Sequence, residues 1–186
     1  MATAAATPGV CFNADYRLSP KATFPDHLVD VKTAIAWIRD HAEEYGIDPD
    51  FLAVTGGSAG GHLTALTALT QNDPRYQPGF ESADTSVQAA VPFYGVYDFT
   101  NRAGTMPSQF RDWFLQPLIM KAFYDDEPER FREASPLDNL RPDLQRYGWR
   151  GCLECQRQRR IMQGRASTGM HVVPVATEPQ QGRSTP

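Results

Sequence analysis

The fold of this chain is decided by one stretch, Phe51-Leu52-Ala53-Val54-Thr55-Gly56-Gly57-Ser58-Ala59-Gly60-Gly61. Its first five residues form a short apolar run that follows a turn, which is typical of a buried strand. Glycines come next, and the residues from His62 to Leu69 have helical composition. A strand that passes through a glycine-rich turn directly into a helix indicates one unit of an α/β sheet.

Residues 56–60 match the pattern G-x-S-x-G. This pattern places a serine on a tight, strained turn, so that its Oγ projects above the sheet. Gly56, Gly57 and Gly60 form the turn on either side and let the strand and helix backbones pass without a Cβ clash. Ser58 is therefore the candidate nucleophile, and the N–H of Ala59 at the helix start is a candidate donor to an oxyanion.

The same residues are also compatible with an ordinary glycine-rich turn, an incidental serine or a phosphate-binding loop. A phosphate loop of the G-x-x-x-x-G-K-[ST] kind requires a lysine, and a dinucleotide loop requires G-x-G-x-x-G. Neither pattern is present. The position between a strand and a helix favours a nucleophile elbow.

The elements on either side extend the same pattern. A short apolar run after Pro8-Gly9 and the run Val87–Phe93 each suit a buried strand, with Pro92 near the end of the second. Apolar residues recur at spacings of three and four between Pro25 and Gly46, which predicts one helix. Alternating strands and helices predict an α/β fold with a mostly parallel sheet and flanking helices.

Four segments together resemble a known family. They are Asp15-Tyr16-Arg17-Leu18-Ser19-Pro20, Gly46-Ile47-Asp48-Pro49-Asp50, Gly56 to His62, and Phe93-Tyr94-Gly95-Val96-Tyr97-Asp98. In this order they resemble the hormone-sensitive-lipase-like esterases, and most of all the bacterial, mycobacterial-type carboxylesterases of that group. The resemblance covers about residues 8–143.

The resemblance implies an α/β-hydrolase fold and the hydrolysis of carboxylic esters through a serine acyl-enzyme. Ser58 would be the nucleophile and Ala59 one oxyanion donor. The implied partner is a small-molecule ester, and no cofactor is expected. The aromatic segment from Met106 to Phe131 would line an acyl pocket or cap, although core packing explains the same residues equally well.

The chain departs from the family upstream of Tyr16. The family carries a His-Gly-Gly-Gly-type oxyanion loop before the strand that ends in Tyr16-Arg17-Leu18, and the fifteen residues before Tyr16 leave no room for it. The strand that leads into this loop would lie between the strand ending at Tyr16 and the strand ending at Thr55. We therefore expect a truncated member whose sheet is incomplete at both ends and lacks a central strand.

The catalytic acid and base are not identifiable from the pattern. The family places its acid in a His-Gly-x-x-Asp stretch, whereas Asp138 and Asp143 read as surface residues near a turn. His27 and His41 precede the serine, and the chain order in this fold is Ser, Asp, His. His62 follows Ser58 by one helical turn and is expected to pack or cap. His171 has the required order and is the candidate base.

Three functions therefore follow from the sequence. The first is a carboxylic ester hydrolase that acts through Ser58. The second is a catalytically inactive hydrolase fragment, because the oxyanion loop, the acid and the base are not recognisable. The third is an amide or formamide hydrolase, which would share the same elbow and the same fold.

The character of the sequence changes near Asp143. Residues 141–186 contain eight Arg, no Lys and three acidic residues, and their apolar residues show neither a strand nor a helix period. We expect residues 1–143 to form the partial hydrolase core and residues 144–186 to form a poorly ordered tail. The abrupt change also suggests the hypothesis that a shifted reading frame begins there.

Composition excludes several other classes. A net charge of −4 argues against a nucleic-acid partner. The sequence contains no run of 18 apolar residues, so no membrane span is predicted. Three cysteines are too few for a disulfide framework, so a cytoplasmic location is expected. Cys152 and Cys155 form a C-x-x-C pair without the four ligands of a structural zinc site, so they read as incidental thiols and no metal is expected.

Overall fold

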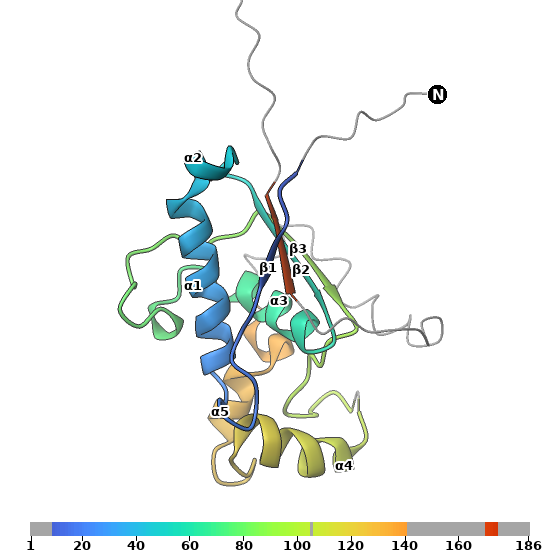
Figure 1. Ribbon diagram of the computed structural model, residues 1–186. Coiled ribbons are helices and arrows are strands. Elements are labelled where there is room, and N and C mark those ends of the chain that lie inside the picture. The colour runs from blue at the N-terminus through green and yellow to red at the C-terminus, as the bar shows by residue number, and fades with distance from the viewer. Residues whose placement is uncertain (1–8, 105, 141–169, 175–186) are drawn as a thin grey trace, which may run out of the picture.

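The structure is a computed structural model that describes residues 9–104, 106–140 and 170–174 (Figure 1). Within these residues a small sheet has the strand order β1-β4-β2-β3. The strands are β1 (Phe12–Ala14), β2 (Leu52–Gly57), β3 (Ala89–Phe93) and β4 (Met170–Pro174). The three strands predicted from the sequence are present, each shifted by a few residues at its ends.

The sheet is parallel except for β4. Strands β2 and β3 pair in parallel, with Thr55 opposite Val91 and Gly57 opposite Phe93. Strand β4 runs antiparallel to both β1 and β2. Strands β1, β2 and β3 therefore share one direction, as alternating strands and helices predict.

The sequence shows no strand pattern after Asp143, but the structure has one strand there, β4. This strand lies between β1 and β2, where the resemblance predicts the strand that leads into the oxyanion loop. Two strands that flank an empty position carry unpaired N–H and C=O groups, and a segment inserted between them satisfies both rows. Alternation of apolar and polar residues does not identify His171-Val172-Val173 as a strand, because so short an apolar run has no clear period.

The remaining residues of the predicted tail, other than those of β4, lie outside the described part of the chain. The predicted boundary between residues 143 and 144 therefore stays a prediction, as does the proposed shift of reading frame. Cys152, Cys155 and Asp143 also fall outside the described residues.

The predicted helix between Pro25 and Gly46 is divided in two. Helix α1 spans Asp26–Asp40 and helix α2 spans Ala42–Tyr45. At His41, between them, the ring Nδ1 lies 2.8 Å from the carbonyl oxygen of Trp37, and the two rings stack with their centroids 4.1 Å apart. The N–H of His41 keeps its bond to the same carbonyl oxygen over 3.1 Å, but its backbone, with φ −107° and ψ 15°, departs from helical values. Gly46 then closes α2 in the left-handed conformation, with φ 62°.

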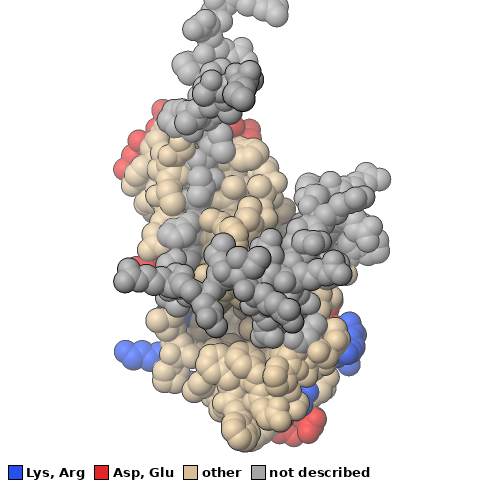
Figure 2. Space-filling model, turned by 90° about the vertical axis from the view of Figure 1, so that its right-hand side faces the viewer, with Lys and Arg blue, Asp and Glu red and all other residues tan. Residues whose placement is uncertain are grey.

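Helices α1 and α3 (Ala59–Leu69) pack on the same side of β2. Leu52 and Val54 are fully buried against them, whereas Thr55, on the other side of the strand, is partly exposed. On β3, Val91 and Phe93 are half exposed. Among the described residues, therefore, helices cover one face of the sheet. In Figure 2 the visible Lys and Arg side chains lie in the lower half of the view, and acidic side chains appear at both ends.

The segments after β3 lie beyond the carboxyl ends of the parallel strands (Figure 1). They are α4 (Ser108–Phe110), the π-helix η2 (Arg111–Met120) that continues it, α5 (Pro128–Glu133) and the 3₁₀-helix η3 (Pro136–Asn139). A further 3₁₀-helix, η1 (Pro74–Tyr76), follows α3. Within the described residues, every helix is too short or too polar to cross a bilayer.

Hydrogen bonds join the loop before α1 to these later segments. The hydroxyl of Thr23 donates to the carbonyl oxygen of Met120 over 3.1 Å. Arg130 Nη2 donates to the carbonyl oxygen of Phe24 over 2.7 Å. The loop that follows β1 is thereby fixed between η2 and α5, at the carboxyl end of the sheet.

We expect the substitution Val172→Pro to destabilise the fold by roughly 1–3 kcal/mol. Proline removes the N–H of Val172 and leaves an acceptor unpaired in a strand that has neighbours on both sides. Urea unfolding followed by circular dichroism measures the change. Val172→Thr is the matched control, because it keeps the N–H and the β-branch. Equal stability of the Pro and Thr variants would show that β4 contributes nothing to the sheet.

Candidate active site

Ser58 occupies the turn between the last residue of β2 and the first residue of α3. Its backbone has φ 56° and ψ −116°, and the residue is exposed. A residue other than glycine rarely adopts a positive φ, and such strain costs on the order of 1–3 kcal/mol. The G-x-S-x-G pattern predicts this strained, exposed serine.

The strained turn is held by the end of β3. The N–H of Ser58 donates to the carbonyl oxygen of Phe93 over 3.1 Å, and the carbonyl oxygen of Ser58 accepts from the N–H of His62 over 3.1 Å. A Cβ added to Gly61 would lie 2.3 Å from the same Phe93 oxygen. The first turn of α3 therefore approaches β3 more closely than any side chain at position 61 allows.

Backbone atoms crowd Gly56 of the motif, whereas a movable side-chain tip crowds Gly57. A Cβ on Gly56 would lie 2.7 Å from the carbonyl carbon of Gly60, because the strand and the helix cross there. A Cβ on Gly57 would lie 2.5 Å from the hydroxyl of Tyr94. The pattern predicts the contact between Gly56 and Gly60. The tyrosine comes from a distant segment, so the motif does not reveal it.

The N–H of Ala59 is free to bind a ligand. Ala59 begins α3 and is exposed, and no described residue accepts a hydrogen bond from its N–H. The first N–H groups of a helix lack partners within the helix and carry the positive end of its dipole. An anionic oxygen beside Ser58 would meet a donor at this position.

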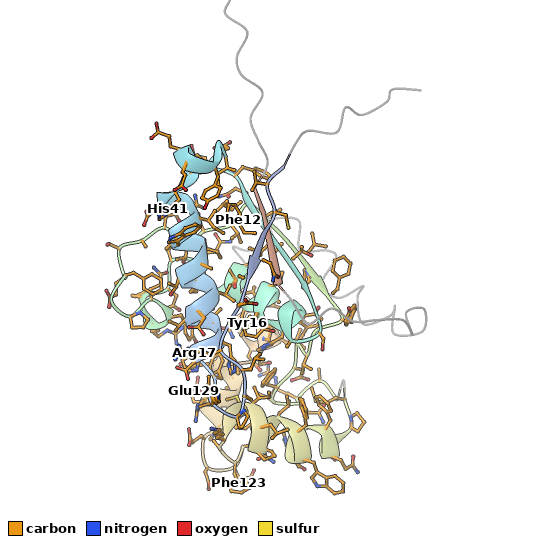
Figure 3. All side chains as sticks on the ribbon, viewed as in Figure 1. Phe12, Tyr16, Arg17, His41, Phe123 and Glu129 are labelled. Carbon is orange, nitrogen blue, oxygen red and sulfur yellow. The ribbon has the colours of Figure 1, made fainter. Side chains whose placement is uncertain are left out.

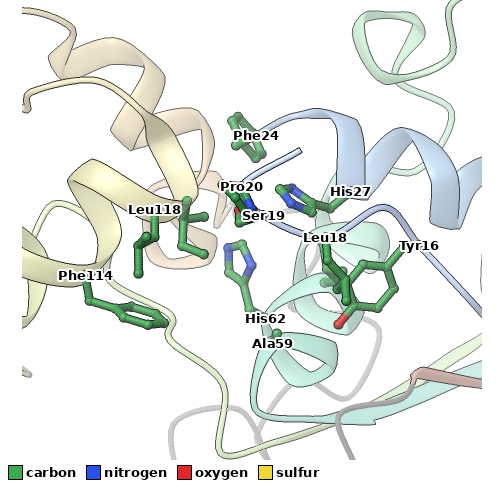
Figure 4. A pocket seen from close by; sticks show the side chains of 12 residues that line it. Tyr16, Leu18, Ser19, Pro20, Phe24, His27, Ala59, His62, Phe114 and Leu118 are labelled. Atoms are coloured by element: carbon green, nitrogen blue, oxygen red, sulfur yellow. The ribbon is translucent and has the colours of Figure 1, made fainter. Parts of the chain in front are cut away.

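A pocket opens beside the elbow (Figure 4). Its volume is about 340 Å³, and its lining comes from the loop after β1, the first turns of α1 and α3, and η2. Most of these side chains are apolar. The lining residues are Tyr16, Leu18, Ser19, Pro20, Phe24, His27, Ala59, His62, Leu63, Phe114, Leu118 and Ile119. Because Ala59 lines the pocket and directly follows Ser58, the pocket opens next to the nucleophile.

The side chains of the aromatic segment after residue 106 divide between a pocket and the core. Phe114 and Leu118 line the pocket, whereas Phe131 is fully buried in the core. Trp113 is 80% exposed and Phe123 is 67% exposed, the latter at the edge of the molecule far from β1 (Figure 3). The sequence could not assign these side chains individually, because a π-helix does not follow the 3.6-residue period.

His62 packs, as predicted. Its Nε2–H donates to the carbonyl oxygen of Ala134 over 2.7 Å, and its ring stacks on Phe99 with the centroids 4.4 Å apart. Burial lowers the pKa of His62 to about 4, against the hydrogen bond to Ala134, which raises it. The imidazole is therefore neutral at neutral pH and holds the start of α3 against the segment after α5.

His27 is a pocket residue that the sequence did not reveal. Chain order excluded it as a base, yet its side chain lines the pocket and is 92% buried, with 8% exposed. It precedes Val31 by four residues, which places both on the buried face of α1. That spacing was the available signal. His41 lies at the opposite end of α1 (Figure 3).

The other predicted residues take different positions. The Cα of His171 pairs with that of Thr55, three residues before Ser58. Asp138 is not the surface residue that the sequence suggested, because its side chain is 8% exposed and pairs with Arg102 at 2.6 Å. Within the described residues, no group of three or more His, Cys, Asp or Glu side chains is arranged to hold a metal ion.

The stability of the chain should fall between pH 6.5 and pH 4 through His62. The unfolded chain takes up a proton near pH 6.5, whereas the folded state resists it until about pH 4, so stability is present above this window and lost within it. The total is about 3 kcal/mol. Urea unfolding at several pH values measures it. His62→Gln should make the slope shallower and leave the part that buried His27, whose pKa is also lowered, contributes. An unchanged slope in His62→Gln would contradict the assignment.

Comparison with known proteins agrees with this geometry. The sequence profile of the BD-FAE family matches residues 3–144. A probable carboxylic ester hydrolase of Mycobacterium tuberculosis, LipM, is 52% identical over 134 residues, which are 72% of this chain and 31% of LipM. The esterase LipQ of the same organism is 55% identical over 128 residues, which are 69% of this chain and 30% of LipQ. The chain thus spans about a third of the length of these curated relatives.

The solved structures point to the same fold. A truncated carbohydrate esterase from the gut microbiota superposes with a TM-score of 0.55 and is 26% identical. The match covers 68% of this chain and 48% of that one. The chain therefore belongs to the BD-FAE family and has a partial α/β-hydrolase fold, as its sequence predicts.

Proposed function

We propose that this chain carries the nucleophile portion of a serine carboxylic ester hydrolase. The observation that supports this most is Ser58, an exposed serine with φ 56° between β2 and α3, next to an apolar pocket. Strain at an exposed turn persists where the surrounding structure fixes it, and it concentrates at functional sites. The relatives LipM, a probable carboxylic ester hydrolase, and LipQ, an esterase, support the same chemistry.

In this function the Ser58 Oγ attacks the carbonyl carbon of an ester and forms a tetrahedral intermediate. The N–H of Ala59 donates to the oxyanion that develops, in a position where the α3 dipole adds to the attraction. The intermediate collapses as the C–O bond to the alcohol breaks and the alcohol leaves with a proton. Water then releases the carboxylic acid from the acyl-enzyme and restores Ser58.

The pocket determines the size and polarity of the substrate. Leu18, Phe114 and Leu118 present apolar surface beside Ala59, within a volume of about 340 Å³. When one arm of the ester enters this pocket, each Å² of apolar surface that it buries contributes about 25 cal/mol to the free energy of binding. We therefore propose a small ester with an uncharged, apolar acyl or alcohol group as the substrate.

The mechanism also requires a general base that takes the proton of Ser58. His171 is the candidate general base, since it follows Ser58 in the chain and β4 pairs with β2 three residues before the serine. A general base contributes roughly 10²–10⁴-fold to the rate. His62 is unsuited to that role, because burial lowers its pKa to about 4 and its ring is stacked on Phe99.

We expect a fluorophosphonate probe to label Ser58 in the full chain and to add one phosphonyl group to the intact mass. Ser58→Ala should abolish labelling. Ser19→Ala is the matched control, because Ser19 lines the same pocket but donates its hydroxyl to Ala22. If His171 is the base, His171→Ala should slow labelling by roughly 10²-fold or more.

The alternatives give different results. No labelling of a folded sample would overturn the proposal and identify the chain as a catalytically inactive hydrolase fragment. Labelling with faster cleavage of acetanilides than of acetate esters would identify an amide hydrolase of the same fold. Equal labelling of the wild type and His171→Ala would remove His171 from the mechanism and leave Ser58 in it.

A further inference from the structure

The pocket beside Ser58 contains few polar side chains, and two of them are already engaged. The hydroxyl of Ser19 donates to the carbonyl oxygen of Ala22 over 3.2 Å. The Nε2–H of His62 donates to the carbonyl oxygen of Ala134 over 2.7 Å. Neither residue therefore has an N–H or O–H left for a ligand in this arrangement.

The ring of His27 is in a different situation. It points from the first turn of α1 toward the middle of the pocket (Figure 4). In the described part of the chain, no residue makes a hydrogen bond with either ring nitrogen, and the Tyr16 ring meets the His27 ring edge-on, with the centroids 6.3 Å apart. The residue is 8% exposed, and its ring nitrogens are not among the buried side-chain atoms that are sealed off without a partner, so they remain accessible to a molecule in the pocket.

The charge state of His27 limits the kind of ligand. Burial lowers the pKa of His27, so the ring is neutral at neutral pH. A neutral imidazole offers one N–H donor and one nitrogen acceptor. Asp26 and Asp30 act electrostatically on this ring from α1, opposed by Arg17 from the loop, and the lining of the pocket is mostly apolar, which favours an uncharged group.

We propose that the pocket binds a neutral, apolar group that carries one hydroxyl, and that His27 is the specificity residue that recognises this hydroxyl. A hydroxyl matches the ring because it both donates and accepts. The rest of the group meets Leu18, Phe114 and Leu118. The inference rests on the proposed function, in which the pocket receives one arm of the ester, and it defines that arm as hydroxylated.

The test measures binding without catalysis. The full chain is labelled with ¹³C and ¹⁵N in its histidine rings and titrated, by NMR, with hexan-1-ol and with 1-methoxypentane. These two compounds have the same number of heavy atoms, but the ether cannot donate a hydrogen bond. We expect hexan-1-ol to bind roughly 3- to 10-fold more tightly and to shift the ring signals of His27.

Variants assign the discrimination to His27. His27→Phe keeps an aromatic ring without polar atoms and should bind both compounds equally, whereas His27→Gln keeps a donor and an acceptor and should retain part of the preference. His41→Gln, at the far end of α1, should behave as the wild type. Circular dichroism checks that each variant is folded; if His27→Phe does not fold, His27→Leu takes its place.

Two results would overturn the inference: equal binding of the two compounds by the wild type, or an unchanged preference in the folded Phe or Leu variant. Either result leaves fluorophosphonate labelling of Ser58 untouched, so the proposed function would survive. Conversely, a chain that prefers hexan-1-ol through His27 but fails to react at Ser58 would retain the binding site and lose the proposed catalysis. The variant Ser58→Ala should still bind hexan-1-ol more tightly than 1-methoxypentane, whether or not Ser58 proves reactive.

Discussion

The rest of the site depends on the close approach of α3 to the end of β3. The carbonyl oxygen of Phe93 accepts the N–H of Ser58 and leaves no space for a Cβ at Gly61. A Cβ on Gly95 would in turn lie 2.5 Å from the backbone nitrogen of His62. Side chains larger than hydrogen would separate the two elements, and Ser58 would then lose the contact that holds its strained backbone.

This approach also connects the elbow to segments far along the chain. His62, one turn into α3, reaches the carbonyl oxygen of Ala134 and stacks on Phe99. The loop after β1 is joined to η2 and α5 by Thr23 and Arg130. The pocket therefore forms where the start of α3 meets a loop that later segments hold in place, and its walls come from segments that are far apart in the sequence.

The position between β1 and β2 is the second constraint on the fold. Parallel strands with a gap between them leave backbone groups unpaired on both sides, and such groups are costly unless another strand supplies partners. Strand β4 takes this position in the antiparallel direction, with Val172 opposite Phe12 on one side and Val54 on the other. The partial hydrolase fold thus draws a central strand from sequence that shows no strand pattern.

The sequence by itself determined the elbow and its frame, because these depend on local physics. A strand, a glycine turn and a helix are adjacent in the chain, and the crossing of Gly56 and Gly60 is fixed within five residues. The tertiary structure alone decided the contents of the pocket, the partner of Asp138 and the place of β4. These contacts join residues more than ten positions apart, and periodicity carries no information about which distant surfaces meet.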